Sequence, residues 1–384
     1  MLFAHLADTH LGYRQYNLDE REEDFYRRFH EAVDKIISAE CEFVVHSGDL
    51  FDSPRPHIRA MLEVMKALDR LSDEGIKVFA IAGNHDVLLR RGAIPPHRLY
   101  RSIEFLTPRN PSRVFRGVYV CGLPYHSKIH AKALVENLKA LAEKAASYEK
   151  RILLMHQGID KYFPLEHEIK IGDLPRGFHY YALGHIHKRI LDNFGEGVIA
   201  YPGSMEMWRI DELRDWKTQG KGFYIVDTDE FSVKKIDLKI RPFIKAEIAS
   251  IGDIPTIKEM ISTQRRPVVR LTVSAEPHEY NRLYQELLRE LSEALYLDIH
   301  RKRTEMEVET EEKPISLKEL IAEAMEDHPG SERDFAYALF EALSTGNIDS
   351  ARNMVREFYD SWAPAPKKKK ESPEKEQARL EAYK

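Results

Sequence analysis

The sequence predicts a layered α/β protein that is followed by a purely helical C-terminal part. Over residues 1–240, short apolar runs rich in β-branched residues alternate with longer segments whose apolar residues recur every three or four positions. The first pattern is typical of buried strands and the second of amphipathic helices. Beyond Pro314 only the helical pattern remains. Strands that alternate with helices favour sheets covered by helices, so we expect an α/β fold for the first part.

Six apolar runs and three amphipathic segments carry this prediction. The expected strands are Leu2–Ala7, Phe43–Ser47, Val78–Ala82, Val118–Gly122, Ile152–Met155 and Tyr180–Leu183. The expected helices contain Phe25–Ile37, Met61–Leu71 and Ile129–Ala146. In each helical segment the apolar residues fall on one face, which predicts a helix packed on a sheet.

The pattern changes in the segment Gly195–Phe243, where three strand-like runs follow one another with little helix between them. They are Val198–Ala200, Phe223–Val226 and Val233–Leu238. Strands in direct succession favour antiparallel pairing, so we expect a second, more antiparallel sheet here. After it, a strand at Val268–Val273 and a helix at Glu279–Leu295 predict a small α+β unit.

The C-terminal region predicts three helices and a tail. Ser316 and Glu319 form a capping-box signature, Pro329-Gly330 precedes a second helix, and Met354–Trp362 marks a third. The tail loses apolar periodicity and carries four consecutive lysines, which predicts disorder. The expected domains are therefore 1–240, 241–310, 311–362 and a disordered basic tail, 363–384.

Composition excludes several classes of protein. A length of 384 residues predicts two or three domains at roughly 150 residues each. A net charge of −5 excludes a wholly basic nucleic-acid coat, so any nucleic-acid contact must come from local patches. The two cysteines, Cys41 and Cys121, exclude thiolate zinc fingers and disulfide scaffolds. No apolar run reaches the ~18 residues of a membrane span, and no secretory signal is visible, so we expect a soluble cytoplasmic protein without a membrane partner.

Five polar motifs lie at the ends of the expected strands. They are Asp8-Thr9-His10, Gly48-Asp49-Leu50-Phe51-Asp52, Gly83-Asn84-His85-Asp86, Met155-His156-Gln157-Gly158 and Gly184-His185-Ile186-His187. The carboxyl ends of strands in open α/β sheets converge on one crevice, so these side chains are expected to meet. The candidate metal ligands are Asp8, His10, Asp49, Asn84, His156, His185 and His187.

The donor set indicates the kind of metal. It combines oxygen and imidazole nitrogen without thiolate, which suits Mn, Fe, Co or Zn better than Ca or Mg. Seven ligands are too many for one ion and suit two, with Asp49 the best placed to bridge them. Paired ions about 3.5–4 Å apart clamp the attacking and leaving oxygens of a phosphoryl displacement.

This ordered series of motifs resembles the calcineurin-like metallophosphoesterase superfamily. Within it, the phrases HLADTHLGYRQ, GDLFDSPRP, GNHD, LMHQG, YYALGHIHKR and YPGS are similar to the double-strand-break repair nucleases of archaea and eukaryotes and their bacterial SbcD relatives. The resemblance is strong over residues 1–245 and extends beyond them only in layout. It implies a sandwich of two sheets flanked by helices, a capping domain at 241–310, and a helical module that binds an ABC-type ATPase with a long coiled coil. It also implies a homodimer that acts on DNA ends.

The resemblance also implies roles for individual residues. Asp8, His10 and His187 would hold the first of two Mn²⁺ ions per subunit. Asn84, His156 and His185 would hold the second, and Asp49 would bridge the two.

Two further residues would act beside the metals. The resemblance implies that His85 contacts the scissile phosphate or protonates the leaving oxygen, and that Asp52 orients His85 through a hydrogen bond. Asp86 would fix the orientation of a ligand. The implied activity is manganese-dependent hydrolysis of DNA, as a double-strand exonuclease and a single-strand endonuclease.

Two other functions stay open. One is a phosphoprotein or nucleotide phosphatase on the same fold, although the protein phosphatases carry an arginine after the second aspartate of GDxxD, where this chain has Ser53. The other is a DNA-end-binding scaffold whose metals support architecture without turnover.

Histidines and arginines outside the motifs receive plainer predictions. We expect His5 and His46 to be packing residues and His97 to lie on the surface or in a loop. Basic residues near the motifs, among them Arg59 and Arg189, predict contacts with DNA phosphates or ordinary surface ion pairs.

Overall fold

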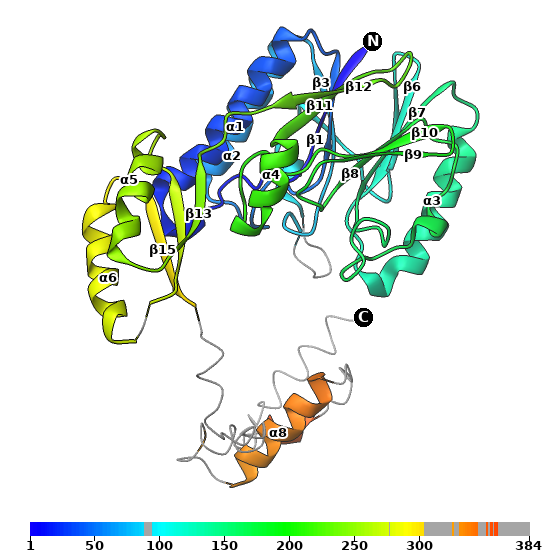
Figure 1. The fold of residues 1–384 in the computed structure, drawn as a ribbon. Coiled ribbons are helices and arrows are strands. Elements are labelled where there is room, and N and C mark those ends of the chain that lie inside the picture. Colours follow the sequence, from blue (N-terminus) through cyan, green and yellow to red (C-terminus); the bar gives the residue numbers. More distant parts are fainter. Residues whose placement is uncertain are drawn as a thin grey trace, which may run out of the picture. The chain divides into compact units, whose positions relative to one another are not determined.

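The computed structural model describes residues 1–87, 94–275, 277–302, 325, 330–344, 351, 354–355 and 357–359. The chain forms two compact units, Met1–Lys302 and Arg303–Lys384, and each is described by itself. In the first unit, two six-stranded sheets lie face to face between layers of helices (Figure 1). Within the described residues, no helix has the length and apolar character needed to cross a membrane.

The first sheet has four parallel strands and two antiparallel strands at one side. Its order is β12 (Val233–Asp237), β11 (Gly222–Asp227), β1 (Leu2–Leu6), β2 (Phe43–Ser47), β3 (Lys77–Ile81) and β4 (Ile103–Phe105). β1 to β4 run parallel, while β11 pairs antiparallel with β1 and β12 antiparallel with β11.

The second sheet also has a parallel centre, but it carries one antiparallel strand at each edge. Its order is β5 (Ser112–Phe115), β6 (Val118–Leu123), β7 (Lys150–His156), β8 (Tyr180–Gly184), β10 (Gly197–Tyr201) and β9 (Ile190–Phe194). The four central strands are parallel.

Alternation along the strands creates the layers. On β2, Phe43 and Val45 pack into the core between the two sheets, whereas Val44 packs into the core under the helices. The helices α1 (Asp19–Ser38) and α2 (Ile58–Asp73) cover the first sheet, and α3 (Ala131–Ala145) covers the second. The 3-10 helices of this part are η1 (Gln15–Asn17), η2 (Pro96–Leu99), η3 (Lys128–His130) and η4 (Ile171–Asp173). The predicted sandwich of two sheets flanked by helices is confirmed.

The expectation of a separate antiparallel sheet in Gly195–Phe243 is wrong. β10 joins the second sheet parallel to β8, and β11 and β12 extend the first sheet beyond β1. The three runs are strands, as expected, but they pair with strands distant in sequence. Periodicity identifies a strand by its own residues and carries no information about its partner.

A third, smaller sheet completes the first unit. Its parallel strands β13 (Phe243–Ile248), β14 (Val268–Val273) and β15 (Tyr296–Arg301) are packed by α5 (Ile254–Ser262) and α6 (Pro277–Glu290), with η6 (Ile251–Asp253) before α5. The small α+β unit is therefore present. The predicted domain boundaries at residues 240, 310 and 362 stay predictions.

Apolar and ionic contacts join the third sheet to the rest of the unit. Phe243, Val268 and Leu295 share a core with residues of the segment that holds η5 (Ile210–Glu212) and α4 (Leu213–Gln219). Beside it, Arg241 binds both oxygens of Asp24, at 2.5 and 2.9 Å. Because this contact is almost fully buried, it ties the third sheet firmly to α1.

In the second unit, the structure describes α8 (Gly330–Ser344), whose start agrees with the expected helix after Pro329-Gly330. Phe335 of this helix stacks on Phe358, with ring centroids 4.0 Å apart. The expected helix at Ser316–Met325 and the tail 363–384 lie outside the described residues, except for Met325.

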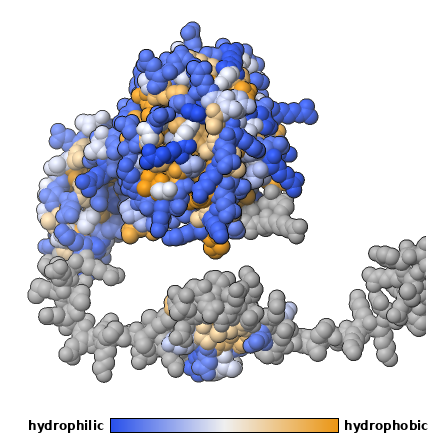
Figure 2. Space-filling view, turned by 90° about the vertical axis from the view of Figure 1, so that its right-hand side faces the viewer, coloured by the Kyte–Doolittle hydropathy of each residue, from blue (hydrophilic) through white to orange (hydrophobic). Residues whose placement is uncertain are grey.

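The surface agrees with the high proportion of charged residues. On the face that Figure 2 presents, hydrophilic side chains cover most of the described surface, and apolar side chains gather in smaller areas between them.

Candidate metal centre

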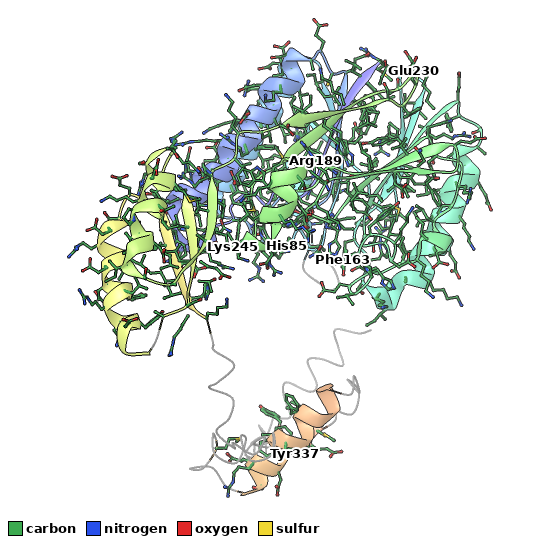
Figure 3. All side chains as sticks on the ribbon, viewed as in Figure 1. His85, Phe163, Arg189, Glu230, Lys245 and Tyr337 are labelled. Atoms are coloured by element: carbon green, nitrogen blue, oxygen red, sulfur yellow. The ribbon has the colours of Figure 1, made fainter. Side chains whose placement is uncertain are left out.

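The polar motifs meet at one end of the two sheets. Asp8, Asp49 and Asn84 follow β1, β2 and β3, while His156 ends β7 and His185 follows β8. These strands are parallel within each sheet, so their carboxyl ends share an edge. Figure 3 shows His85 and Phe163 at this end and Glu230 at the opposite end.

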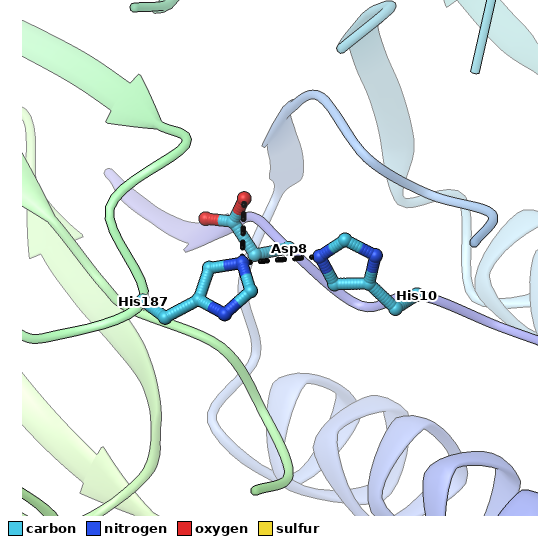
Figure 4. A group of neighbouring side chains, drawn as sticks. All are labelled: Asp8, His10 and His187. Atoms are coloured by element: carbon cyan, nitrogen blue, oxygen red, sulfur yellow. Dashed lines mark hydrogen bonds and ion pairs between the residues drawn. The ribbon is translucent and has the colours of Figure 1, made fainter. Parts of the chain in front are cut away.

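One group of donors consists of Asp8, His10 and His187, whose ligand atoms lie within 4.8 Å of one another (Figure 4). The Nε2 atoms of His10 and His187 are 3.1 Å apart, and Nε2 of His187 is 3.9 Å from Oδ1 of Asp8. Two imidazole nitrogens that face each other beside a carboxylate form a suitable pocket for a cation.

The second group gathers around Asn84 and Asp49. The side-chain oxygen of Asn84 lies 3.1 Å from Nε2 of His156 and 3.0 Å from Nδ1 of His185. Oδ2 of Asp49 is 3.2 Å from His156 Nε2 and 3.8 Å from His10 Nε2. The carboxylate of Asp49 therefore lies between the two groups.

The backbone around the donors is strained. Asp8, His10, Asp49 and His185 have φ angles of 51°, 44°, 54° and 90°, a region that non-glycine residues rarely adopt. Such strain persists only where surrounding structure enforces it, and it concentrates at functional sites.

A glycine is required where two of the motifs approach each other. A Cβ atom on Gly83 would clash with the side chain of Asp49, so only glycine lets the loop after β3 come this close. This contact explains the glycine that opens the Gly83–Asp86 motif.

Electrostatics support a bound cation. Asp8 and Asp49 are buried, and a buried carboxylate without a positive partner is costly. Burial alone would raise the pKa of Asp49, but His156, His10 and His85 together lower it far below its ordinary value. Burial and His156 lower the pKa of His185 to about 3, which leaves this ring neutral, as a metal ligand must be. The residues present thus fit a divalent cation.

His85 lies at the open side of this centre with 29% of its side chain exposed. Its backbone N–H donates to Asp49 at 2.8 Å, and its Nδ1 donates to the backbone carbonyl of Asp52 at 3.0 Å. The carboxylate of Asp52, expected to accept a hydrogen bond from His85, lies 4.0 Å from Nδ1 of that ring and does not make this bond. It contacts Nδ1 of His10 at 3.2 Å instead.

Glu212 supports this centre and was not predicted from the sequence. It lies 2.9 Å from Nδ1 of His187 through Oε1, and Lys221 donates to its Oε2 at 2.5 Å. Burial alone would raise the pKa of Glu212, but Lys221 and His187 hold it far below its ordinary value. A carboxylate bound to the outer nitrogen of a histidine fixes the tautomer that a metal needs.

Trp208 is the second supporting residue that the sequence did not reveal. Its ring lies 5.3 Å from His10, 5.0 Å from His187 and 5.7 Å from His85, and its Nε1 donates to Asp52 at 3.2 Å. It therefore fixes three histidines and one carboxylate relative to one another.

Asp86 and His97 lie behind the ligands. Asp86 accepts hydrogen bonds from the backbone N–H groups of Leu50, Phe51 and Gly83, so it joins two of the motif-bearing loops. His97, expected on the surface or in a loop, lies in η2 between β3 and β4. Of the two alternatives the surface position is wrong, because the ring is buried, stacks on Phe105 at 4.9 Å and lies 3.7 Å from Asp86.

Two histidines and two arginines outside the motifs can also be compared with their predictions. His5 and His46 are buried, as expected, and burial lowers the pKa of His5 to about 3. Arg189 is buried and binds Asp237, and Arg59 binds Glu23, so ion pairing describes both better than contact with DNA.

Comparison with known proteins agrees with this geometry. Residues 1–189 match the family described as calcineurin-like phosphoesterase. The chain is 35% identical to the DNA double-strand break repair protein Mre11 of Methanocaldococcus jannaschii, over 94% of this chain and 99% of the relative. Identity is 34% to the protein of the same name from Methanococcus maripaludis, over 91% and 97%, and 32% to that from Saccharolobus solfataricus, over 91% and 96%.

The chain is thus a metallophosphoesterase by fold and by donor set. Within this class it belongs to the Mre11 family of DNA double-strand break repair proteins. The predicted family and the predicted dependence on a divalent metal are confirmed.

Proposed function

We propose that this protein is a manganese-dependent DNA nuclease that hydrolyses phosphodiester bonds at DNA ends in double-strand-break repair. One observation carries the proposal: side chains that follow β1, β2 and β3 of one sheet meet side chains from the ends of β7 and β8 of the other, and Asp49 lies within 3.8 Å of both His10 and His156. Asp8, His10 and His187 would hold one Mn²⁺, Asn84, His156 and His185 the other, and Asp49 both. Bound there, the two ions would activate water and neutralise charge on the phosphate.

The side chains of this protein then have distinct tasks. Nδ1 of His85 donates a hydrogen bond to the backbone carbonyl of Asp52. Nε2 of the same ring is therefore the atom that can give a proton to the leaving oxygen. Glu212 and Trp208 hold the ligand rings in place.

The proposed partners are DNA, a second copy of this chain and an ABC-type ATPase with a coiled coil. Ile58, Leu62 and Met65 follow one another along one face of α2 and are exposed, which supports a homodimer through this helix. In the second unit, Phe340, Val355 and Tyr359 are exposed, which supports docking of the ATPase there. A cytoplasmic location fits the two free, buried cysteines.

A nuclease assay on linear double-stranded DNA tests this function. With Mn²⁺ the protein should degrade DNA, chelator should abolish the activity, and His85→Ala should lower the rate by roughly 10²–10⁴-fold, the usual worth of a general acid. His300→Ala, which removes an exposed histidine of β15, is the matched control and should cleave normally.

Two results would overturn the proposal. Dephosphorylation of a phosphoprotein without DNA cleavage would show a phosphatase on the same metal centre. DNA binding without turnover, in the presence of Mn²⁺ and the ATPase, would indicate a scaffold.

A further inference from the structure

A cavity of about 510 Å³ opens beside the candidate metal centre. Its lining comes from three parts of the chain: residues 82–84, 87, 94, 95 and 98 between β3 and β4, residues 105–109 from the end of β4, and residues 124–125 after β6. Asn84 belongs both to the lining of the cavity and to the second donor cluster, so the cavity adjoins the candidate metal centre. This size falls in the roughly 300–1,000 Å³ range of small-molecule sites.

The walls of the cavity are mainly apolar and include two aromatic rings. Phe105 and Tyr125 contribute the rings, and Leu106, Pro108 and Pro124 contribute aliphatic surface. Among the described residues that line it, none is acidic, whereas Arg98 and Arg109 are basic and exposed. The walls therefore suit a flat apolar group that is attached to an anionic chain.

Tyr125 stands at the junction of the cavity and the metal centre. Its ring centroid is 5.7 Å from that of His185, and its hydroxyl donates to Glu168 at 3.3 Å. Glu168 also accepts from the backbone N–H of Gly158 at 2.7 Å. The ring of Tyr125 is thus held in place before any ligand arrives, as a stacking surface requires.

We infer that this cavity receives an unpaired nucleobase of the strand being cut. The inference rests on the proposed nuclease function, which places a phosphate near Asn84 and therefore the attached nucleoside within reach of the cavity. Bases stack on aromatic side chains without strict sequence preference. Exposed arginines suit the flanking phosphates. Removing a base from a duplex costs a few kcal/mol, which stacking in the cavity offsets.

Abasic substrates provide the test. Linear duplexes are prepared with normal nucleotides, or with abasic nucleotides in the last three positions of each strand, and cleavage by the full-length protein is measured with Mn²⁺. The inference predicts that ends with bases are cut about tenfold faster, a ratio within the range expected from base–aromatic stacking. Without a base site the ratio would be one or lower, because abasic ends separate more easily.

A variant that fills the cavity sharpens the test. Pro108→Trp places a large ring at the exposed wall, and the ratio of the two rates should fall toward one. The matched control is Val114→Trp, at an exposed position of β5 that does not line the cavity, and it should keep the ratio of the unchanged protein.

The outcomes of these assays distinguish the nucleobase site from the nuclease function. Manganese-dependent cleavage at equal rates on both substrates would overturn the nucleobase site and leave the nuclease function standing. Failure to cleave either substrate would overturn the nuclease function, and the nucleobase site with it. A Pro108→Trp variant that cleaves with the full tenfold preference would also contradict the site.

Discussion

At the scale of single residues, the candidate metal ligands depend on partners outside the donor clusters. His187 presents Nε2 to the first cluster because Glu212 engages its Nδ1, and Lys221 holds Glu212 by a hydrogen bond to Oε2 and itself contacts the His187 carbonyl at 2.8 Å. The carboxylate thus fixes both the tautomer and the angle of the ring.

Replacing Glu212 should weaken metal binding rather than the chemistry. Glu212→Gln keeps the shape of the side chain but loses its charge, so we expect affinity for Mn²⁺ to fall roughly 10–100-fold, the usual effect of losing such a partner. Cleavage at saturating Mn²⁺ should be largely restored. Isothermal titration and a Mn²⁺ series of rates measure both effects.

The control is Glu230→Gln, which removes a carboxylate at the opposite end of the sheets (Figure 3). Equal affinities for Mn²⁺ in the Glu212 and Glu230 variants would contradict the role given to Glu212.

The meeting of the polar motifs was predictable at this scale, but the residues that support them were not. Each ligand adjoins an apolar run, and the ends of parallel strands meet, so position along the chain was enough to group them. Trp208 and Glu212 lie in no motif and reach the histidines only through tertiary folding. His97 follows two prolines and looks like a loop residue, yet packing against Phe105 buries it.

At the scale of elements, a buried ionic network joins α1, the segment before η5 and the start of β13. Arg21 donates to Asp24 at 2.6 Å, to Glu206 at 3.3 Å and to the Met207 carbonyl at 3.1 Å. Gln15, which accepts from Arg21 at 2.8 Å, donates in turn to the carbonyl of Trp208 at 2.7 Å. The network therefore runs from the third sheet to Trp208, which packs on His10, His85 and His187.

Glu206 makes the stability of this network depend on pH. Burial raises the pKa of Glu206, and Arg21 only partly offsets this effect. Between the ordinary pKa and the raised value, the folded state binds a proton that the unfolded state has lost, so stability falls as pH rises through this window. The slope is at most about 1.4 kcal/mol per pH unit for one group.

Glu206→Gln should remove this contribution. The difference in unfolding free energy between the variant and the unchanged protein should therefore grow in favour of the variant as pH rises from about 4.5, the ordinary pKa of a glutamate. Urea unfolding across this range, in chelator, measures the difference. If the difference in unfolding free energy between the two proteins did not change with pH, Glu206 would keep its ordinary pKa.

For the strands, the sequence predicts where each one lies but not which strands pair with each other. The runs that became β1, β2, β3, β7 and β8 were located correctly because each is short, apolar and followed by polar residues. The pairing of β1 with β11 joins residues more than 200 positions apart, such as Leu2 and Asp227. No local pattern specifies such a contact, which is why three of the twelve sandwich strands, β10, β11 and β12, were assigned to the wrong sheet arrangement.

At the scale of the whole molecule, the exposed face of α2 is the surface through which we expect two copies of the chain to associate. Leu62 and Met65 are 43% and 44% exposed, whereas Leu68 and Leu71 of the same helix are buried in the core. The apolar stripe expected at Met61–Leu71 is therefore shared between the core and a free surface. Apolar residues at positions 58, 62 and 65 form a continuous surface that a second copy can cover.

A charge on this face should prevent the proposed dimer from forming. Leu62→Glu would bury a carboxylate at the interface without a partner, so light scattering should give the mass of one chain, 44.7 kDa, instead of twice that value. Leu288→Glu, at a position of α6 with 42% exposure, is the control and should remain dimeric. If the Leu62→Glu variant had the mass of two chains, like the Leu288→Glu control, α2 would be excluded as the interface.

A count of bound Mn²⁺ ions tests the shared two-metal centre most directly. Equilibrium titration should give two ions per chain, and electron paramagnetic resonance should show that they are magnetically coupled, because Asp49 lies between both clusters. Asp49→Ala should abolish the coupling and weaken both sites. A single bound ion at saturation, or two uncoupled ions in the unchanged protein, would contradict a shared two-metal centre.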